Sequence, residues 1–200
     1  MGDGSSLTED EAEERALLAA VRSGDERAFE RLVARHAPSV FRIVAGHLGP
    51  TDAEDAAQEV FTRVYLGLKG YKGEARLSTW IFRVATNVAL TRASKKRRRD
   101  PVRPFEEEPP SSAPPPGEEL LAQERREAVR RAVEQLPEEQ RSVVLLRSEG
   151  LSFEEVARVL GILRPTAESR MARAKERLRA ILERFMSGDE SKNTDQRERD

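Results

Sequence analysis

Apolar residues recur at helical spacing, three or four positions apart, along most of the chain. Such spacing collects them on one face of a helix, and that face must pack against another element to leave water. The spacing stops between residues 100 and 119 and resumes at Leu120. The pattern therefore predicts an all-α protein whose hydrophobic core is divided between two small helical domains joined by a flexible linker.

Residues 11–99 are predicted to form the first domain from four helices. Pro38 is expected to divide the first two, because proline lacks an amide donor and clashes with the preceding turn. The third helix is expected to start at Thr51–Glu54, which has the form of a capping box, and to end near Leu68. Ser78 is the candidate cap for the fourth helix, which runs into a basic segment.

Residues 120–186 are predicted to form the second domain, again from helices. Pro137 suits the first position of one helix, and Ser152–Glu155 has the form of a second capping box. Gly161 is expected to turn the chain sharply after a short helix. Thr166 is then the expected cap of a long last helix.

Composition marks the linker and the two ends. Seven of the eleven prolines lie between Pro101 and Pro116, within residues 100–119, and proline resists both helix and strand. Residues 1–10 are small and polar, and residues 187–200 contain no large apolar side chain. Both ends are therefore predicted to be disordered.

Charge is balanced over the whole chain but not along it. The 35 basic and 36 acidic residues give a net charge of -1, yet residues 92–103 carry seven bases and one acid.

The chain has no cysteine, which excludes disulfides, thiolate zinc sites and cysteine nucleophiles. There is no signal-peptide pattern, and no apolar stretch approaches the ~20 residues of a membrane span. A cytoplasmic protein without membrane insertion is expected.

Residues 151–178 have the pattern of a helix-turn-helix, in which a short helix packs through the small Ala157 against a second helix that enters the major groove of DNA. The inner positions of the second helix are small or apolar: Ala167, Met171 and Ala174. Its outer positions are polar or basic: Thr166, Ser169, Arg170 and Arg173. Arginines there can donate to guanine or hold phosphates, whereas the alternative is a plain helical hairpin with a solvated basic face.

Two segments together indicate a family. GLSFEEVARVLGI, followed by ESRMARAKERLR, resembles region 4 of the extracytoplasmic-function (ECF, group 4) sigma factors of the sigma-70 family. The earlier segment DAEDAAQEVFTRVYLGLKGYKGEARLSTWIFRVATNVAL resembles their region 2. The resemblance covers roughly residues 25–99 and 120–184. It implies a non-catalytic subunit of RNA polymerase, with core polymerase, promoter DNA and an anti-sigma factor as partners and with no cofactor or metal.

In that family region 2 binds the core polymerase and opens the minus-10 promoter element, and region 4 reads the minus-35 element. The resemblance assigns the polymerase contact to three residues of the DAAQE segment: Asp55, Gln58 and Glu59. A solvated helix face opposite an apolar one is the alternative. The linker between the regions either occupies a basic channel of the polymerase or only tethers the two domains.

The resemblance also implies DNA contacts in region 2. Trp80 lies in STWIF, which matches the family's melting segment, but it also shares an apolar stripe with Val84 and has a core position as its alternative. Ile81 replaces the second aromatic residue of the housekeeping pattern, so strand opening is expected to depend more on the loop Lys69–Leu77, which in this family captures a flipped base. Asn87 matches a frequent asparagine close to DNA. The basic run supplies charge for phosphates, or else forms a solvated helix end: Lys95, Lys96, Arg97, Arg98 and Arg99.

In region 4, Arg164, Arg170 and Arg173 are expected to hold the DNA backbone. The chain departs from the family's pattern at Thr91, Pro165 and Glu168. Glu168 stands where many relatives have a basic residue, and it is expected in the first turn of the recognition helix. It either accepts a hydrogen bond from a cytosine amino group or weakens region 4 as a general DNA binder.

Two other classes of function compete with this interpretation. A stand-alone helix-turn-helix regulator would leave the DAAQE and STWIF segments without a role. An enzyme acting on nucleic acid would need a cluster of catalytic groups, but His36 and His47 fall in different predicted helical stretches without paired carboxylates, and no P-loop is present.

Overall fold

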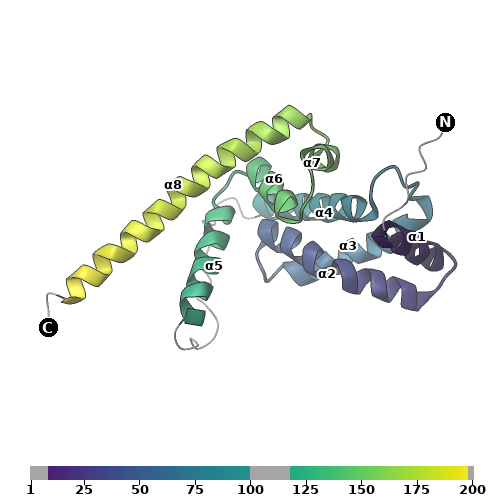
Figure 1. The fold of residues 1–200 in the computed structure, drawn as a ribbon, viewed down its shortest axis with the longest axis horizontal. Coiled ribbons are helices and arrows are strands. Elements are labelled where there is room, and N and C mark those ends of the chain that lie inside the picture. The colour runs from purple at the N-terminus through teal and green to yellow at the C-terminus, as the bar shows by residue number, and fades with distance from the viewer. Residues whose placement is uncertain (1–8, 100–117, 198–200) are drawn as a thin grey trace. The chain divides into compact units, whose positions relative to one another are not determined.

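The computed structural model describes residues 9–99 and 118–197, and every long regular element in those ranges is an α-helix (Figure 1). The chain divides into two compact units, Met1–Thr91 and Arg92–Asp200. Within the described ranges, none of the helices has an apolar stretch that would reach across a bilayer. The predicted all-α fold with two helical domains is confirmed. The predictions for three segments lie outside the described residues: 1–8, 100–117 and 198–200.

Residues 9–99 form four α-helices, the number that the apolar spacing predicts, with one short 3-10 turn, and the first unit ends within the last of these helices (Figure 1). They are α1 Glu9–Arg22, α2 Glu26–Leu48, α3 Ala53–Gly67, η1 Leu68–Gly70 and α4 Leu77–Arg99. α2 packs against α3, and α1 packs against α2 and η1. The core is aliphatic, and its fully buried side chains include Leu32, Val40, Ile43, Val60, Val64, Leu68 and Ile81.

The break between α1 and α2 lies at Gly24, so the prediction that Pro38 divides two helices is wrong. Gly24 has a φ of 93°, which glycine adopts without steric cost. The side chain of Asp25 then caps α2 by accepting a hydrogen bond from the amide of Ala28 at 3.1 Å. Pro38 lies inside α2 and is exposed, as is Ala34 one turn earlier. The carbonyl that loses its helical partner is therefore open to water, which reduces the cost of the proline.

The cap residue of α3 lies one position after Thr51, the residue predicted to cap this helix. α3 starts at Ala53 with Asp52 as its cap residue, and Asp52 makes no capping hydrogen bond through its side chain. Its backbone already has helical angles, with φ −90° and ψ −4°. The amide of Ala53 donates to the carbonyl of Pro50 at 3.1 Å, so a tight turn leads into this helix.

Ser78 is not the cap of α4, because the helix starts one residue earlier, at Leu77. The amide of Trp80 donates to the carbonyl of Arg76 at 3.0 Å, which places Ser78 inside the first turn. The free amide of Leu77 donates to Oε1 of Glu14 in α1 at 2.7 Å. Glu14 of α1 thus supplies the capping interaction that was predicted for Ser78.

The second unit is built around α8. Its helices are α5 Glu118–Glu134, α6 Glu138–Ser148, α7 Phe153–Leu160 and α8 Arg164–Arg197, and α8 packs against the other three. Pro137 is the cap residue of α6, one position before the predicted one. Arg141 of α6 donates to the carbonyls of Glu134 and, at 2.9 Å, Leu136, so it closes the end of α5. The buried core includes Ala132, Leu136, Val143, Leu146, Val156, Ala167 and Ala174.

α8 starts at Arg164, two residues before the predicted cap Thr166. The amide of Ala167 donates to the carbonyl of Leu163 at 3.1 Å, so Leu163 is the cap residue. Pro165 fits the first turn because its fixed φ is helical and first-turn amides have no partner within the helix. α8 also continues to Arg197, past the residue at which the folded domain was expected to end.

Candidate nucleic-acid interface

The helix-turn-helix predicted from the sequence is present. Ser152 caps α7 in a complete capping box: its Oγ accepts from the amide of Glu155 at 3.2 Å, and Oε2 of Glu155 accepts from the amide of Ser152 at 2.8 Å. Ala157 is buried, and α7 packs against α8. Gly161 has φ 64° and ψ 35°, the left-handed conformation that lets α7 end and α8 begin in so few residues.

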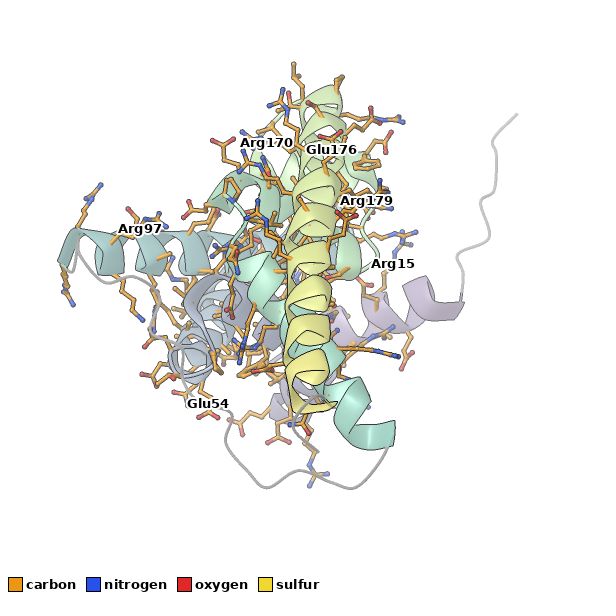
Figure 2. All side chains as sticks on the ribbon, turned by 90° about the vertical axis from the view of Figure 1, so that its left-hand side faces the viewer. Arg15, Glu54, Arg97, Arg170, Glu176 and Arg179 are labelled. Carbon is orange, nitrogen blue, oxygen red and sulfur yellow. The ribbon has the colours of Figure 1, made fainter. Side chains whose placement is uncertain are left out.

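Four of the predicted DNA-contacting residues come together at the start of α8. Thr166, Ser169, Arg170 and Arg173 line a pocket of about 480 Å³ whose other wall is the N-terminal end of α6. Ser169 and Arg173 are exposed, whereas Thr166 and Arg170 are half-buried, so only part of this set points freely outward. Figure 2 shows Arg170 toward one end of α8, with Glu176 and Arg179 farther along the helix.

Two residues of α6 belong to this pocket and were missed by the sequence analysis. Glu139 pairs with Arg170, with 2.7 Å between Oε2 and Nη2. Gln140 is buried, and its Oε1 has no hydrogen-bond partner among the described residues. Nothing local in the sequence distinguishes these two from other polar residues of a helix start, because their role depends on α8 lying alongside.

Arg164 is paired with two carboxylates. Its Nε donates to Oε1 of Glu168 at 2.7 Å, and its Nη1 contacts Glu154 of α7. The hydrogen bond from Glu168, and then the negative charge of Glu154, raise the pKa of Arg164 above its usual value. Glu168 lies in the second turn of α8 and not in the first, because the helix starts earlier than predicted. Glu154, Arg164 and Glu168 therefore form an ion-pair triad, called here the region-4 triad, that joins the two helices of the helix-turn-helix.

The sequence left open whether Trp80 lies in the core or is available to DNA, and the structure places it between these two positions. It is half-buried, and its ring lies 5.3 Å from that of Tyr71 at an interplanar angle of 44°. Its other side faces Gly67, where a Cβ atom would come within 3.0 Å of the indole. A side chain at residue 67 would thus push the indole away, so glycine allows α3 and α4 to approach at Trp80.

The loop between η1 and α4 is held by α1. Arg22 donates from Nε to the carbonyl of Leu68 at 3.3 Å and from Nη2 to the carbonyl of Tyr71. The hydroxyl of Tyr71 donates to the carbonyl of Ala75 and so closes the loop on itself. Burial, and then the charge of Glu14, raise the pKa of Tyr71, and the nearby Arg22 partly offsets this. The exposed side chains of the braced loop are Lys72, Glu74 and Arg76.

The other DNA contacts predicted in residues 11–99 lie on one exposed stripe of α4. Asn87, Thr91 and Lys95 follow one another at intervals of four residues, and all three are exposed. The stripe continues into the exposed basic end of the helix: Lys96, Arg97, Arg98 and Arg99. Figure 2 shows Arg97 in this terminal part of α4, where side chains extend outward from the ribbon.

The three residues of the DAAQE segment share the solvent-facing side of α3. Asp55 and Gln58 are exposed, and Glu59 is half-buried and pairs with Arg63 at 2.6 Å. The opposite side of the helix is buried through Ala56, Val60 and Val64.

The two histidines lie on the same helix, α2, because Pro38 does not interrupt it, and both are buried. The expectation that they fall in different helical stretches is therefore wrong. In the described ranges, histidine, aspartate and glutamate form no group of three or more that would hold a metal ion.

Two family models and several characterised proteins match the chain. The model described as Sigma-70 region 2 matches residues 32–99, and that described as Sigma-70, region 4 matches residues 126–178. The ECF RNA polymerase sigma-E factor of Escherichia coli (strain K12) is 32% identical over 173 residues, which cover 82% of this chain and 91% of that protein. This chain belongs to the ECF group of the sigma-70 family. As a sigma factor, it serves transcription initiation.

Other sigma factors extend the likeness over most of the chain. The RNA polymerase sigma-H factor of Pseudomonas aeruginosa is 29% identical over 182 residues, which cover 86% of this chain and 94% of that one. The solved structure of CnrH in complex with the cytosolic domain of CnrY matches with a TM-score of 0.65 and 26% identity, over 85% of this chain and 97% of that one. The sigma factor RpoE, in complex with the anti-sigma factor NepR from Bartonella quintana, shares the fold with a TM-score of 0.64 and 22% identity, over 78% of this chain and 96% of that one.

The region-2 match starts inside α2, so α1 precedes it. α1 nevertheless supplies Glu14 and Arg22, which hold the loop and the start of α4. These contacts join residues 46 and 63 positions apart, and sequence spacing has no signal for such pairs. In this sigma factor, the segment before the matched region 2 is thus part of the same structural unit.

Proposed function

We propose that this sigma factor binds core RNA polymerase as a non-catalytic subunit, with region 2 opening the minus-10 element and region 4 reading the minus-35 element. The observation that carries the proposal is the gathering of Thr166, Ser169, Arg170 and Arg173 around one pocket at the start of the recognition helix. Hydroxyls and arginines at this place fit a contact with base edges and phosphates of duplex DNA.

We propose the loop braced by α1 as the part of region 2 that captures a flipped base. Its backbone is held by Arg22 and by the Tyr71 hydroxyl, so a base pocket formed there would be ordered before DNA arrives. Trp80 is half-buried and its ring lies next to that of Tyr71. It would therefore support this loop and not insert into the DNA duplex. The exposed stripe from Asn87 to the basic end of α4 would then hold the phosphates beside the opened bubble.

Core polymerase would bind the exposed side of α3 through Asp55, Gln58 and Glu59. This side ends in two exposed apolar residues, Tyr65 at 54% and Leu66 at 71% exposure, which suit a protein interface better than bulk water. An anti-sigma factor is the other proposed partner, by analogy with RpoE and its complex with NepR. Since the polymerase acts in the cytoplasm, the proposed location is cytoplasmic.

Run-off transcription with purified core polymerase tests the proposal. Adding the protein should yield defined transcripts from a subset of genomic promoters, whereas core polymerase alone should yield none. Arg173→Ala should reduce those transcripts on promoters that retain a minus-35 element and should matter less when that element is scrambled. If the protein adds no initiation, the proposed function is wrong, and binding of duplex DNA without polymerase would then favour the stand-alone regulator.

A further inference from the structure

Carboxylates of the same domain hold two of the arginines on the proposed DNA-facing side of region 4. In the region-4 triad, Arg164 is paired with both Glu154 and Glu168, at 2.7 Å from the latter. Arg170 is paired with Glu139 at 2.7 Å on the wall of the pocket. Arg173 lines the same pocket and is exposed. Carboxylates of the protein thus already bind two of the arginines that are proposed to contact DNA phosphates.

Helix stability does not account for this arrangement. Arg164 is the first residue of α8, where the helix dipole disfavours a cation. An arginine that precedes its glutamate by four positions is also the less favourable order for such a pair. The members of the region-4 triad remain 57%, 53% and 42% exposed, and exposed pairs contribute little to folding and are screened by salt.

The positions of Glu154 and Arg164 in the helix-turn-helix explain the ion pairs better. Glu154 lies in the first turn of α7, and Arg164 opens α8. The starts of these two helices are where the free amides and the dipoles of a helix-turn-helix attract phosphates of the DNA backbone. A carboxylate that binds an arginine there uses the same charge-assisted hydrogen bonds that a phosphate would use.

We propose that Glu154 and Glu168 hold Arg164 in the free sigma factor in the place of DNA phosphates, and that Glu139 holds Arg170 in the same way. Duplex DNA must exchange its phosphates for these carboxylates when it binds. The inference rests on the proposed contact of region 4 with DNA and adds a self-masking device to it. Its consequence is weak binding of free sigma factor to DNA of arbitrary sequence.

The exchange also sets the salt dependence. An arginine that meets a phosphate releases a counterion from DNA, but the carboxylate left behind takes up a cation. Each masked arginine therefore contributes less to the salt dependence than a free one does. Removing the carboxylates should restore that contribution, about 0.9 in the slope of log K against log salt for each arginine set free.

Fluorescence anisotropy tests this with the full-length chain and a labelled duplex of about 20 base pairs without promoter sequence. Glu154→Gln with Glu168→Gln should bind more tightly than the wild type and with a slope steeper by about 0.9. The gain in affinity should then be about 3.5 times larger at about 50 mM than at about 200 mM NaCl. Both substitutions keep the size of the side chain and leave the capping residue Glu155 untouched, and circular dichroism confirms folding.

Two further variants separate masking from a general loss of negative charge. Glu176→Gln with Glu183→Gln removes the same charge from exposed positions farther along α8, at least ~18 Å from Arg164 along the helix, and should change affinity much less. Arg164→Gln added to the first double variant should abolish its gain. The inference is overturned if the two double variants behave alike, if the gain persists without Arg164, or if none of the proteins binds the duplex. Promoter-directed run-off transcription by the wild type is measured in parallel, and its presence or absence decides the proposed function independently.

Discussion

Glu14, in α1, accepts a hydrogen bond from the amide of Leu77, the first residue of α4, at 2.7 Å. The first amides of a helix have no partner within it, and a negative charge there also interacts favourably with the helix dipole. The packing of α1 therefore completes the start of the helix that carries Trp80, Asn87 and the basic run.

Glu14→Ala should lower the free energy of unfolding of the first unit by about 1 kcal/mol, because loss of a capping side chain costs about 0.5–2 kcal/mol. Trp80 is the chain's single tryptophan, so its fluorescence during urea titration reports on this unit alone. The matched control is Glu13→Ala, which removes an exposed 3.6 Å ion pair with Arg35 and should cost about 0.5 kcal/mol or less. If the two variants lose the same free energy of unfolding, the hydrogen bond from the amide of Leu77 to Glu14 does not stabilise the first unit.

His36 should make the first unit less stable as the pH falls. Burial of the imidazole, whose ring lies 6.4 Å from that of Phe82, and the positive charge of Arg35 lower the pKa of His36 from 6.5 to about 4. Between these values the unfolded chain binds a proton that the folded chain does not. The stabilisation is therefore complete above the unfolded pKa of 6.5 and is lost as the pH falls toward 4.

From about pH 7 to about pH 5, this difference amounts to a loss of about 2 kcal/mol. Urea titrations followed by Trp80 fluorescence at both pH values measure the loss. Carboxylates also titrate in this range, so the loss is compared with that of His36→Gln, which cannot take up the proton. The wild type should lose about 2 kcal/mol more than the variant. The same loss in both proteins would mean that His36 is protonated without penalty in the folded state.

Ser152→Ala should destabilise the second unit by about 1 kcal/mol, because it removes the capping box of α7. Circular dichroism at 222 nm during thermal unfolding measures the effect. Ser148→Ala is the matched control: its exposed hydroxyl donates only to the carbonyl of Leu145, at 2.7 Å, and its loss should cost about 0.5 kcal/mol or less. If Ser148→Ala is as harmful as Ser152→Ala, the capping box is not what stabilises the helix-turn-helix.

Asp55→Ala with Gln58→Ala should weaken binding to core polymerase and leave stability within about 0.5 kcal/mol, because both side chains are exposed. Co-purification with core polymerase measures the first effect, and Trp80 fluorescence the second. Lys72→Ala with Glu74→Ala, in the braced loop, is the control and should retain polymerase binding. Undiminished co-purification of the first variant would show that this side of α3 is not the polymerase interface.

Local signals located most of the secondary structure and part of the site. The number of α-helices in residues 11–99, the capping box at Ser152 and the turn at Gly161 follow from apolar spacing and cap residues, and the structure contains them. Local signals were wrong at Pro38 and Ser78, where the surroundings of the helix decide. Solvent beside Ala34 makes the proline tolerable.

The sequence by itself determined the all-α fold, the helix-turn-helix and the family, because these depend on residues close together in the chain: helical spacing, caps, turns and contiguous motifs. Only the tertiary structure decided which polar groups far apart in the chain are partners. Glu14 caps a helix that starts 63 positions away, and Glu139 and Glu154 hold arginines of α8. Such pairs form where the packing of apolar faces brings side chains within hydrogen-bond distance, and the order of residues along the chain does not encode that distance locally.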